Sequence, residues 1–250
     1  MVRVMLSFTL KKSVVVPVVA LALALAPQVA EAKHYRGTNH SDTLRGKAAN
    51  DVLKAKDGND TVIGAGGKDR AYGQDGADKV SGGGGNDLVD GGAGNDTVQG
   101  GGGNDTGLGG DGDDHVTGQA GDDELDGGAG NDSVQGGAGN DHVMGGDGVD
   151  DLDGGDGNDV LEDGAGDDHL SADKGDDVLR VGDGADDVHA EEGADTIYLT
   201  DDGVMDTVFC GPGASGDPGD QVIFLGQRDP LDDIRNCPPP TVQRSGARSH

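Results

Sequence analysis

The nonapeptide GGAGNDTVQ, residues 91–99, is one of eighteen consecutive units of the same pattern, which follow one another without insertion over residues 37–198. Related units read GGAGNDSVQ (127–135) and GGDGNDVLE (154–162). Position six is Asp in all eighteen units and position four is Gly in sixteen. Position eight is Val, Leu or Ile in sixteen units, with Ala71 and Gly107 as the exceptions. A strict period of this kind indicates a stacked repeat architecture.

The units fit the pattern G-G-x-G-x-D-x-U-x, in which U is an aliphatic residue. The chain therefore resembles the hemolysin-type, or repeats-in-toxin (RTX), calcium-binding nonapeptide repeat family over about two thirds of its length. The resemblance implies that calcium lies between adjacent turns, ligated by the position-six Asp and by backbone carbonyl groups of the turns.

The nonapeptide can also be interpreted from the physical chemistry of its residues. Glycines at positions one, two and four permit tight turns, and positions seven to nine form a strand whose middle residue faces inward. Two nonapeptides make one coil, so the expected fold class is all-β, a parallel β-roll (β-solenoid) of about nine two-strand coils with a small C-terminal cap. Gly107 is expected to leave the interior underfilled, so that Gly107→Val would stabilise the roll by about 1–2 kcal/mol.

Stacking of the coils predicts the metal site. The Asp of one unit lies beside the Asp two units further on, as with Asp96 and Asp114, and two carboxylates held so close repel. Ca²⁺ relieves this repulsion because it accepts about six to eight hard oxygen ligands in flexible geometry, whereas Mg²⁺ demands a tight octahedron. The predicted cofactor is Ca²⁺. The predicted ligands are Asp51, Asp60, Asp69, Asp78, Asp87, Asp96, Asp105, Asp114, Asp123, Asp132, Asp141, Asp150, Asp159, Asp168, Asp177 and Asp186.

Composition supports a role for the metal in folding. The 250-residue chain contains 50 Gly, is only 32% hydrophobic and has a formal net charge of -30. These values are also typical of disordered acidic chains, but disorder does not require an aliphatic residue in phase with every Asp. One buried aliphatic contributes about 1.5–3 kcal/mol, which cannot offset the about 1–2 kcal/mol of backbone entropy for each of nine ordered residues. Folding is therefore expected to need calcium, and nucleic-acid binding is disfavoured by the charge.

The N-terminus differs in character from the repeats. Lys11 and Lys12 precede an apolar run at 14–26, and Ala30-Glu31-Ala32 provides small residues for cleavage after Ala32. This pattern predicts a signal peptide and hence a secreted, extracellular protein with no membrane span in its mature form, because the run is too short for a comfortable span. A retained anchor is the alternative. The expected divisions are 1–32 signal peptide, 33–198 repeats, 199–237 cap and 238–250 disordered tail.

The two cysteines, Cys210 and Cys237, lie beyond the repeats. In an oxidising compartment they most simply form one disulfide, and two unpaired thiols are the alternative. The segments DTVFCGPG (206–213) and DDIRNCP (232–238) are similar to the ends of secreted actinobacterial calcium-binding proteins of the RTX family.

Other signals do not favour catalysis. The sequence lacks G-x-S-x-G, H-E-x-x-H and P-loop motifs, and its periodic carboxylates set no acid and base apart. His115, His142 and His169 are too far apart in a roll to share a zinc ion, and the only local cluster of metal-ligand types that the roll predicts is His169 with Asp187 or His189, where a second metal is the alternative to a solvated strand face. The sequence thus predicts a non-enzymatic protein whose partners are calcium ions. A surface adhesin or matrix spacer is an alternative whose partner is unknown, and an ice-binding solenoid would need a regular Thr array that position seven lacks.

Overall fold

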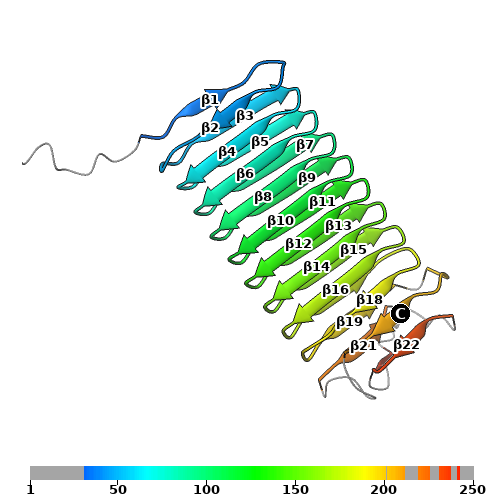
Figure 1. The fold of residues 1–250 in the computed structure, drawn as a ribbon. Helices are drawn as coiled ribbons and strands as arrows, with labels where there is room; N and C mark the ends of the chain where they lie inside the picture. Colours follow the sequence, from blue (N-terminus) through cyan, green and yellow to red (C-terminus); the bar gives the residue numbers. More distant parts are fainter. Residues whose placement is uncertain (1–30, 201, 212–218, 226–230, 238–240, 243–250) are drawn as a thin grey trace, which may run out of the picture.

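The computed structural model describes residues 31–200, 202–211, 219–225, 231–237 and 241–242. Most of the expected signal peptide and most of the expected tail lie outside these residues. Every regular element in the described residues is a β-strand, and the strands build one parallel β-solenoid (Figure 1). The predicted fold class is therefore confirmed. In the described part of the chain, no helix is long and apolar enough to cross a membrane.

Successive strands alternate between two parallel sheets. The odd-numbered sheet contains β1 (His34–Arg36), β3 (Val52–Asp57), β5 (Arg70–Asp75), β7 (Leu88–Ala93), β9 (Thr106–Asp111), β11 (Glu124–Ala129), β13 (His142–Asp147), β15 (Val160–Ala165), β17 (Val178–Val181), β19 (Thr196–Leu199), β21 (Gln221–Phe224) and β23 (Thr241–Val242). The even-numbered sheet contains β2 (Thr43–Arg45), β4 (Thr61–Gly66), β6 (Lys79–Gly84), β8 (Thr97–Gly102), β10 (His115–Ala120), β12 (Ser133–Ala138), β14 (Asp151–Asp156), β16 (His169–Lys174), β18 (Asp187–His189), β20 (Thr207–Phe209) and β22 (Asp233–Arg235).

Strands in the middle of the roll are longer than the sequence predicts. From β3 to β16 each has six residues and covers positions seven to nine of one unit and one to three of the next. Neighbouring strands pair 18 residues apart, as in Val116 opposite Val134. The glycines at positions one and two were expected in turns, but they lie in the strands, and position two pairs with the next coil, as in Gln119 opposite Gly137. Only positions four to six are left for the turn.

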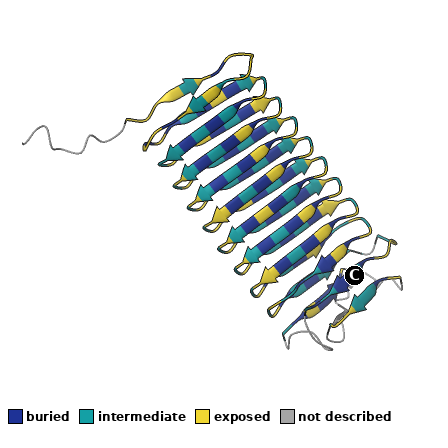
Figure 2. Cartoon of the chain, viewed as in Figure 1, coloured by how far each residue is buried: buried dark blue, intermediate teal, exposed yellow. Residues whose placement is uncertain are grey.

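Each strand of the middle coils turns two positions inward, position eight of one unit and position one of the next, and the position-eight side chains make up most of the core. Position-eight side chains such as Val98, Val116 and Leu125 are completely buried, and buried positions alternate with more exposed ones along the strands (Figure 2).

The expected empty space at Gly107 is absent. A Cβ atom on Gly107 would lie 2.9 Å from Leu125 Cδ2 and 3.2 Å from Val116 Cγ1, so neighbouring side chains already fill the position and Val would need them to move.

Two features of the turns explain the choice of residues there. Position-four glycines such as Gly94 have positive φ (124° for Gly94), which favours residues without a Cβ atom. Position five is often Asn or Asp because its side chain accepts the position-five N–H of the next coil. The Asn158 N–H, for example, donates to Asn140 Oδ1 at 2.9 Å.

The C-terminal segment extends the solenoid. β20 and β22 continue the even-numbered sheet, and β21 and β23 continue the odd-numbered one. The predicted disulfide joins Cys210 to Cys237, with Cα atoms 5.0 Å apart. The expected cap is therefore made of further coils of lower regularity, fastened by this bond.

Candidate metal centre

The sixteen Asp residues predicted as calcium ligands occupy equivalent positions, each in the turn just before a strand. All sixteen are buried, with at most 4% of each residue exposed to solvent. They form two columns, one along each edge of the roll, because successive units alternate between the two sheets. Burial of a column of carboxylates is costly unless each oxygen finds a donor or a cation.

One oxygen of each predicted ligand does find a donor. The backbone N–H of Asp96 donates to Asp114 Oδ1 at 2.7 Å, and that of Asp114 donates to Asp132 Oδ1 at 2.8 Å. The same bond, always to the Asp one coil further on, repeats along both edges from Lys33 N–H to Asp51 Oδ1 at the N-terminal end. The Oδ1 atoms thus hold the coils in register.

The other oxygen is buried without a hydrogen-bond partner. This holds for Oδ2 of fifteen consecutive position-six residues, from Asp60 to Asp186. The first two units differ, because Asp42 Oδ2 accepts the Thr38 N–H at 2.5 Å and Asp51 Oδ2 accepts the Lys47 N–H at 2.8 Å. A buried carboxylate oxygen without a donor is strongly disfavoured, so fifteen of them in succession indicate sites that fit a cation.

Backbone oxygens lie close to these carboxylates. A Cβ atom on Gly91, at position one, would be 2.5 Å from Asp96 Oδ2 and 2.7 Å from the carbonyl oxygen of Gly109 on the next coil. Both oxygens therefore border the same small space, which a side chain would fill. Carboxylate and carbonyl oxygens are the ligands that Ca²⁺ takes in proteins, and the residues present therefore fit calcium.

The pKa values of these buried carboxyl groups also favour a cation at the sites. Burial, the largest cause, raises the pKa of Asp96 to about 7, and the carboxylates of Asp114 and Asp78 raise it further. The pKa of Asp105 is likewise raised to about 7, and that of Asp114 to about 6, first by burial and then by neighbouring carboxylates. Without a cation, ionisation of these groups is therefore shifted upward, from the usual acidic range of Asp towards neutral pH.

A further carboxylate, Asp163, was missed by the sequence analysis. It occupies position one, where most units have Gly, and its carboxylate oxygens come within 4.8 Å of those of Asp168 and Asp186. All three residues are at least 97% buried. Asp163 Oδ1 accepts the N–H groups of Gly164 and Gly182, whereas its Oδ2 is buried without a partner. Burial raises its pKa to about 7, with Asp186 as the next cause. The signal available in the sequence was an acidic residue at position one.

The ladder of Asp residues also continues past the regular repeats. The N–H of Asp186 donates to Asp206 Oδ1 at 3.2 Å, and that of Asp195 to Asp220 Oδ1 at 3.1 Å. The N–H of Asp206 donates in turn to Asp232 Oδ1 at 3.4 Å. The nine-residue period does not predict these residues, because their spacing is irregular. Their signal was an aliphatic residue two positions after each Asp, as in the repeats.

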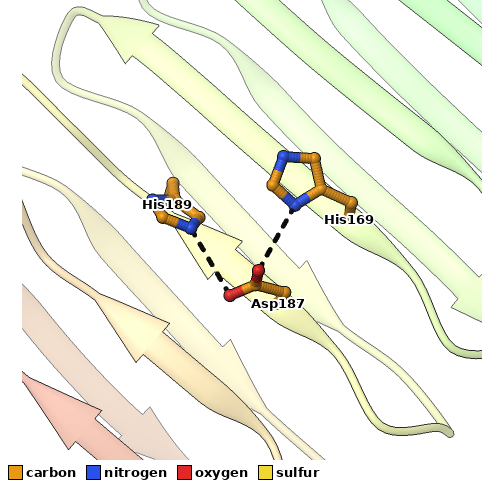
Figure 3. A group of neighbouring side chains, drawn as sticks. All are labelled: His169, Asp187 and His189. Atoms are coloured by element: carbon orange, nitrogen blue, oxygen red, sulfur yellow. Dashed lines mark ion pairs between the residues drawn. The ribbon is translucent and has the colours of Figure 1, made fainter.

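The three histidines at position seven, His115, His142 and His169, do not share one site. His115 and His169 lie in the even-numbered sheet and His142 lies in the odd-numbered one, as expected. His142 Nε2 lies 3.3 Å from Glu162 Oε1, and His115 Nδ1 lies 3.3 Å from Ser133 Oγ. His169 instead gathers with Asp187 and His189 on the outer face of the sheet (Figure 3).

Comparison with known proteins agrees with this geometry. The sequence model of the RTX calcium-binding nonapeptide repeat (4 copies) matches residues 36–71, 63–98, 72–107, 99–134, 126–161 and 162–197. These overlapping segments together span residues 36–197, which is more than half of the chain. A search of curated proteins found no matching relative.

Proposed function

Because the chain belongs to the family of RTX calcium-binding nonapeptide repeat proteins, and its repeats therefore bind Ca²⁺, we propose that it is a secreted protein whose β-roll folds when calcium binds between its coils. The observation that carries this proposal is the row of fifteen buried Oδ2 atoms without a donor, from Asp60 to Asp186. Calcium would supply the positive charge that the chain itself does not place there.

The proposed ligands come from two neighbouring coils. Position-six Asp residues provide the carboxylate oxygens, and carbonyl groups of the glycine-rich segments provide neutral oxygens, as at Asp96 and Gly109. Chain residues also exclude water from the site, since both neighbouring coils bury these carboxylates. At the gap between Asp168 and Asp186, the carboxylate of Asp163 would add a third negative charge.

Sites need not be equivalent along the roll. Four units carry an apolar side chain at position one, at Ala55, Ala172, Val181 and Ala190, where Gly otherwise leaves space beside the carboxylate. Asp51 differs as well, because Lys47 already donates to its Oδ2. We therefore place the strongest sites in the middle of the roll, between Asp69 and Asp168.

Secretion provides the reason for a calcium-dependent fold. The residues before the repeats have the features of a signal peptide, and extracellular calcium modules typically bind with Kd of about 10⁻⁴–10⁻³ M. The chain would cross the membrane unfolded and form its coils outside the cell. Members of this repeat family are generally structural or calcium-binding rather than catalytic, and the proposal includes no catalytic role.

The ligand assignment can be tested by counting bound calcium. Equilibrium dialysis of the mature chain with radioactive calcium should show fewer bound ions for the double variant Asp96→Asn with Asp114→Asn than for the parent. The control, Asp111→Asn with Asp147→Asn, removes the same formal charge from two exposed position-three residues and should keep the parent's number. Equal loss in the two double variants would show that net charge, and not the buried column, governs binding.

A further inference from the structure

A second cluster of candidate ligands lies on the outer face of the even-numbered sheet, away from the interior of the roll. His169 is the first residue of β16, and Asp187 and His189 are the first and last residues of β18. The two strands pair in parallel, with His169 opposite Asp187 and Ser171 opposite His189. Two imidazoles and one carboxylate, up to 20 residues apart in sequence, are therefore brought to one patch by the roll.

The ligand atoms in this cluster face one another. His169 Nδ1 lies 3.8 Å from Asp187 Oδ2, and His189 Nε2 lies 3.4 Å from Asp187 Oδ1, so the carboxylate stands between the two rings (Figure 3). One ligand atom from each residue lies within 4.8 Å of the other two. Because zinc–ligand bonds are about 2.0–2.2 Å long, ligand atoms around one zinc ion lie closer to one another than 4.8 Å. Small rotations of the side chains would bring the three ligand atoms to that separation.

Neighbouring side chains hold His189 in position. Its ring stacks on Phe209 of β20, with centroids 5.0 Å apart and planes 15° apart. Its Nδ1 lies 3.6 Å from Glu191 Oε1, on the side of the ring away from Asp187. A carboxylate at the second ring nitrogen is the usual way in which a metal-binding histidine is oriented, since it leaves the other nitrogen free to bind the ion.

The type of ligand separates this cluster from the calcium sites. The calcium sites present only oxygen atoms, whereas imidazole nitrogen is preferred by Zn²⁺ and by other transition metals. Burial also separates the two kinds of site, because the Asp186 residue is 2% exposed whereas the side chain of its neighbour Asp187 is 53% exposed. Three protein ligands with solvent access leave a coordination position for water.

We propose that His169, Asp187 and His189 bind one divalent transition-metal ion, with Zn²⁺ as the best match, on the surface of the calcium-loaded roll. This function goes beyond calcium binding. It depends on the coils being formed, because only strand pairing brings β16 and β18 together.

The test uses the mature chain with calcium in excess, so that the oxygen sites are occupied and the roll is folded. Zn²⁺ is titrated in competition with a chromophoric chelator, and Co²⁺ is titrated separately, since its visible absorption reports nitrogen ligation. The parent should bind one Zn²⁺ per chain. His169→Gln and His189→Gln should each weaken that binding by about tenfold or more.

Matched controls are the histidines at equivalent strand positions, in His115→Gln and His142→Gln, which should bind Zn²⁺ as the parent does. Circular dichroism in calcium confirms that each variant keeps its β-structure. His169→Gln leaves the stack on Phe209 untouched and therefore decides the matter if His189→Gln disturbs the fold. Unchanged Zn²⁺ affinity in His169→Gln, or an equal loss in the controls, would overturn the proposal.

Discussion

At the scale of the residue, the position-six Asp has two tasks, and its two oxygens divide them. Oδ1 accepts a backbone N–H from the preceding coil, as Asp114 does from Asp96, and so holds adjacent coils together. Oδ2 is left buried beside backbone carbonyl groups. Asn could perform the first task but would present a neutral group for the second. This division explains why the units from Asp60 to Asp186 have Asp, and not Asn, at position six.

Asp163 tests whether a buried extra carboxylate strengthens calcium binding. Asp163→Asn retains an oxygen for the N–H groups of Gly164 and Gly182 and removes the negative charge. We expect the calcium concentration at the folding midpoint to rise, and the β-structure without metal to increase slightly because one buried repulsion is removed. Circular dichroism during a calcium titration measures both quantities.

The control for this change is Asp183→Asn, which removes one charge from an exposed position-three residue of the next coil. It should leave the midpoint close to that of the parent. If Asp163→Asn and Asp183→Asn behaved alike, Asp163 would have no specific part in binding calcium.

The sequence predicted where the position-six residues lie in the fold, because every unit repeats the same Asp and coil stacking places these residues in two columns. Asp163 could not be predicted in this way, since it occurs once and its meaning depends on position one facing inward. That direction followed from the strands extending through positions one to three. The expectation that the glycines at positions one, two and four all form turns did not reveal this direction.

At the scale of the element, the strands require a positive φ at position two of many units, and not all of these units have Gly there. Many units have Gly there with positive φ, but Lys56, Ala65, Gln74, Gln119, Asp173 and Glu191 adopt positive φ with a side chain. Each of these residues is strained, because the left-handed region costs a residue with a Cβ atom about 1–2 kcal/mol. The strands thus contain local strain at defined places.

Gln119→Gly should relieve this strain. Gln119 has φ 81° and an exposed side chain, so Gly loses little contact and gains an allowed conformation. We expect the free energy of unfolding in saturating calcium to rise by about 1 kcal/mol, as measured by urea denaturation. Gln99→Gly, at a strand position without positive φ, should instead lower it by about 0.5–1 kcal/mol. Equal destabilisation by both changes would contradict this explanation.

The disulfide should stabilise the last coils while contributing little to calcium binding. Cys210→Ser breaks the bond to Cys237, which closes a segment of 27 residues. Loss of such a bond typically costs about 2–4 kcal/mol, so the melting temperature of the calcium-loaded form should fall. The number of bound ions should stay near that of the parent, because the bond lies beyond the regular repeats. A large drop in bound calcium would show that the terminal coils control the whole roll.

The repeat period predicted the strands of the middle coils, but not their length and not the final four strands. β20 to β22 follow insertions that break the period, and they are recognisable only because Asp206, Asp220 and Asp232 keep an aliphatic residue two positions later; β23 lacks this signal. Pairing along an existing sheet edge, and not spacing, defines these elements.

At the scale of the whole molecule, the net charge of -30 and the small core make the metal-free roll sensitive to pH. Burial raises the pKa of Asp96 to about 7 from an ordinary value of 3.8, and the pKa of Asp177 is raised in the same way to about 7. Between about pH 4 and about pH 7, the folded state therefore binds more protons than the unfolded state. The stability that protonation of these two groups contributes is fully present below about pH 4 and is lost as the pH rises through about 7.

We therefore expect acid to substitute in part for calcium. In metal-free buffer, lowering the pH from about 8 to about 5 should increase β-structure, as followed by circular dichroism. In limiting calcium, the same acidification should release bound ions, because protons compete for the same oxygens. Sodium chloride at pH 8 screens surface repulsion without protonating buried groups, so it should be less effective than acid. A metal-free chain that lost β-structure on this acidification would contradict the assignment of buried, unpaired carboxylates.

Calcium binding and formation of the β-roll are expected to be one process, since binding to such sites supplies folding free energy. The most direct measurement is circular dichroism of the mature chain as calcium is added to metal-free protein at neutral pH and low salt, with Mg²⁺ at equal concentrations in parallel. We predict a coil-like spectrum without metal, a steep and cooperative gain of β-structure with Ca²⁺ because each ion bridges two coils, and no comparable gain with Mg²⁺. A full β-roll spectrum persisting in the metal-free protein would contradict this expectation.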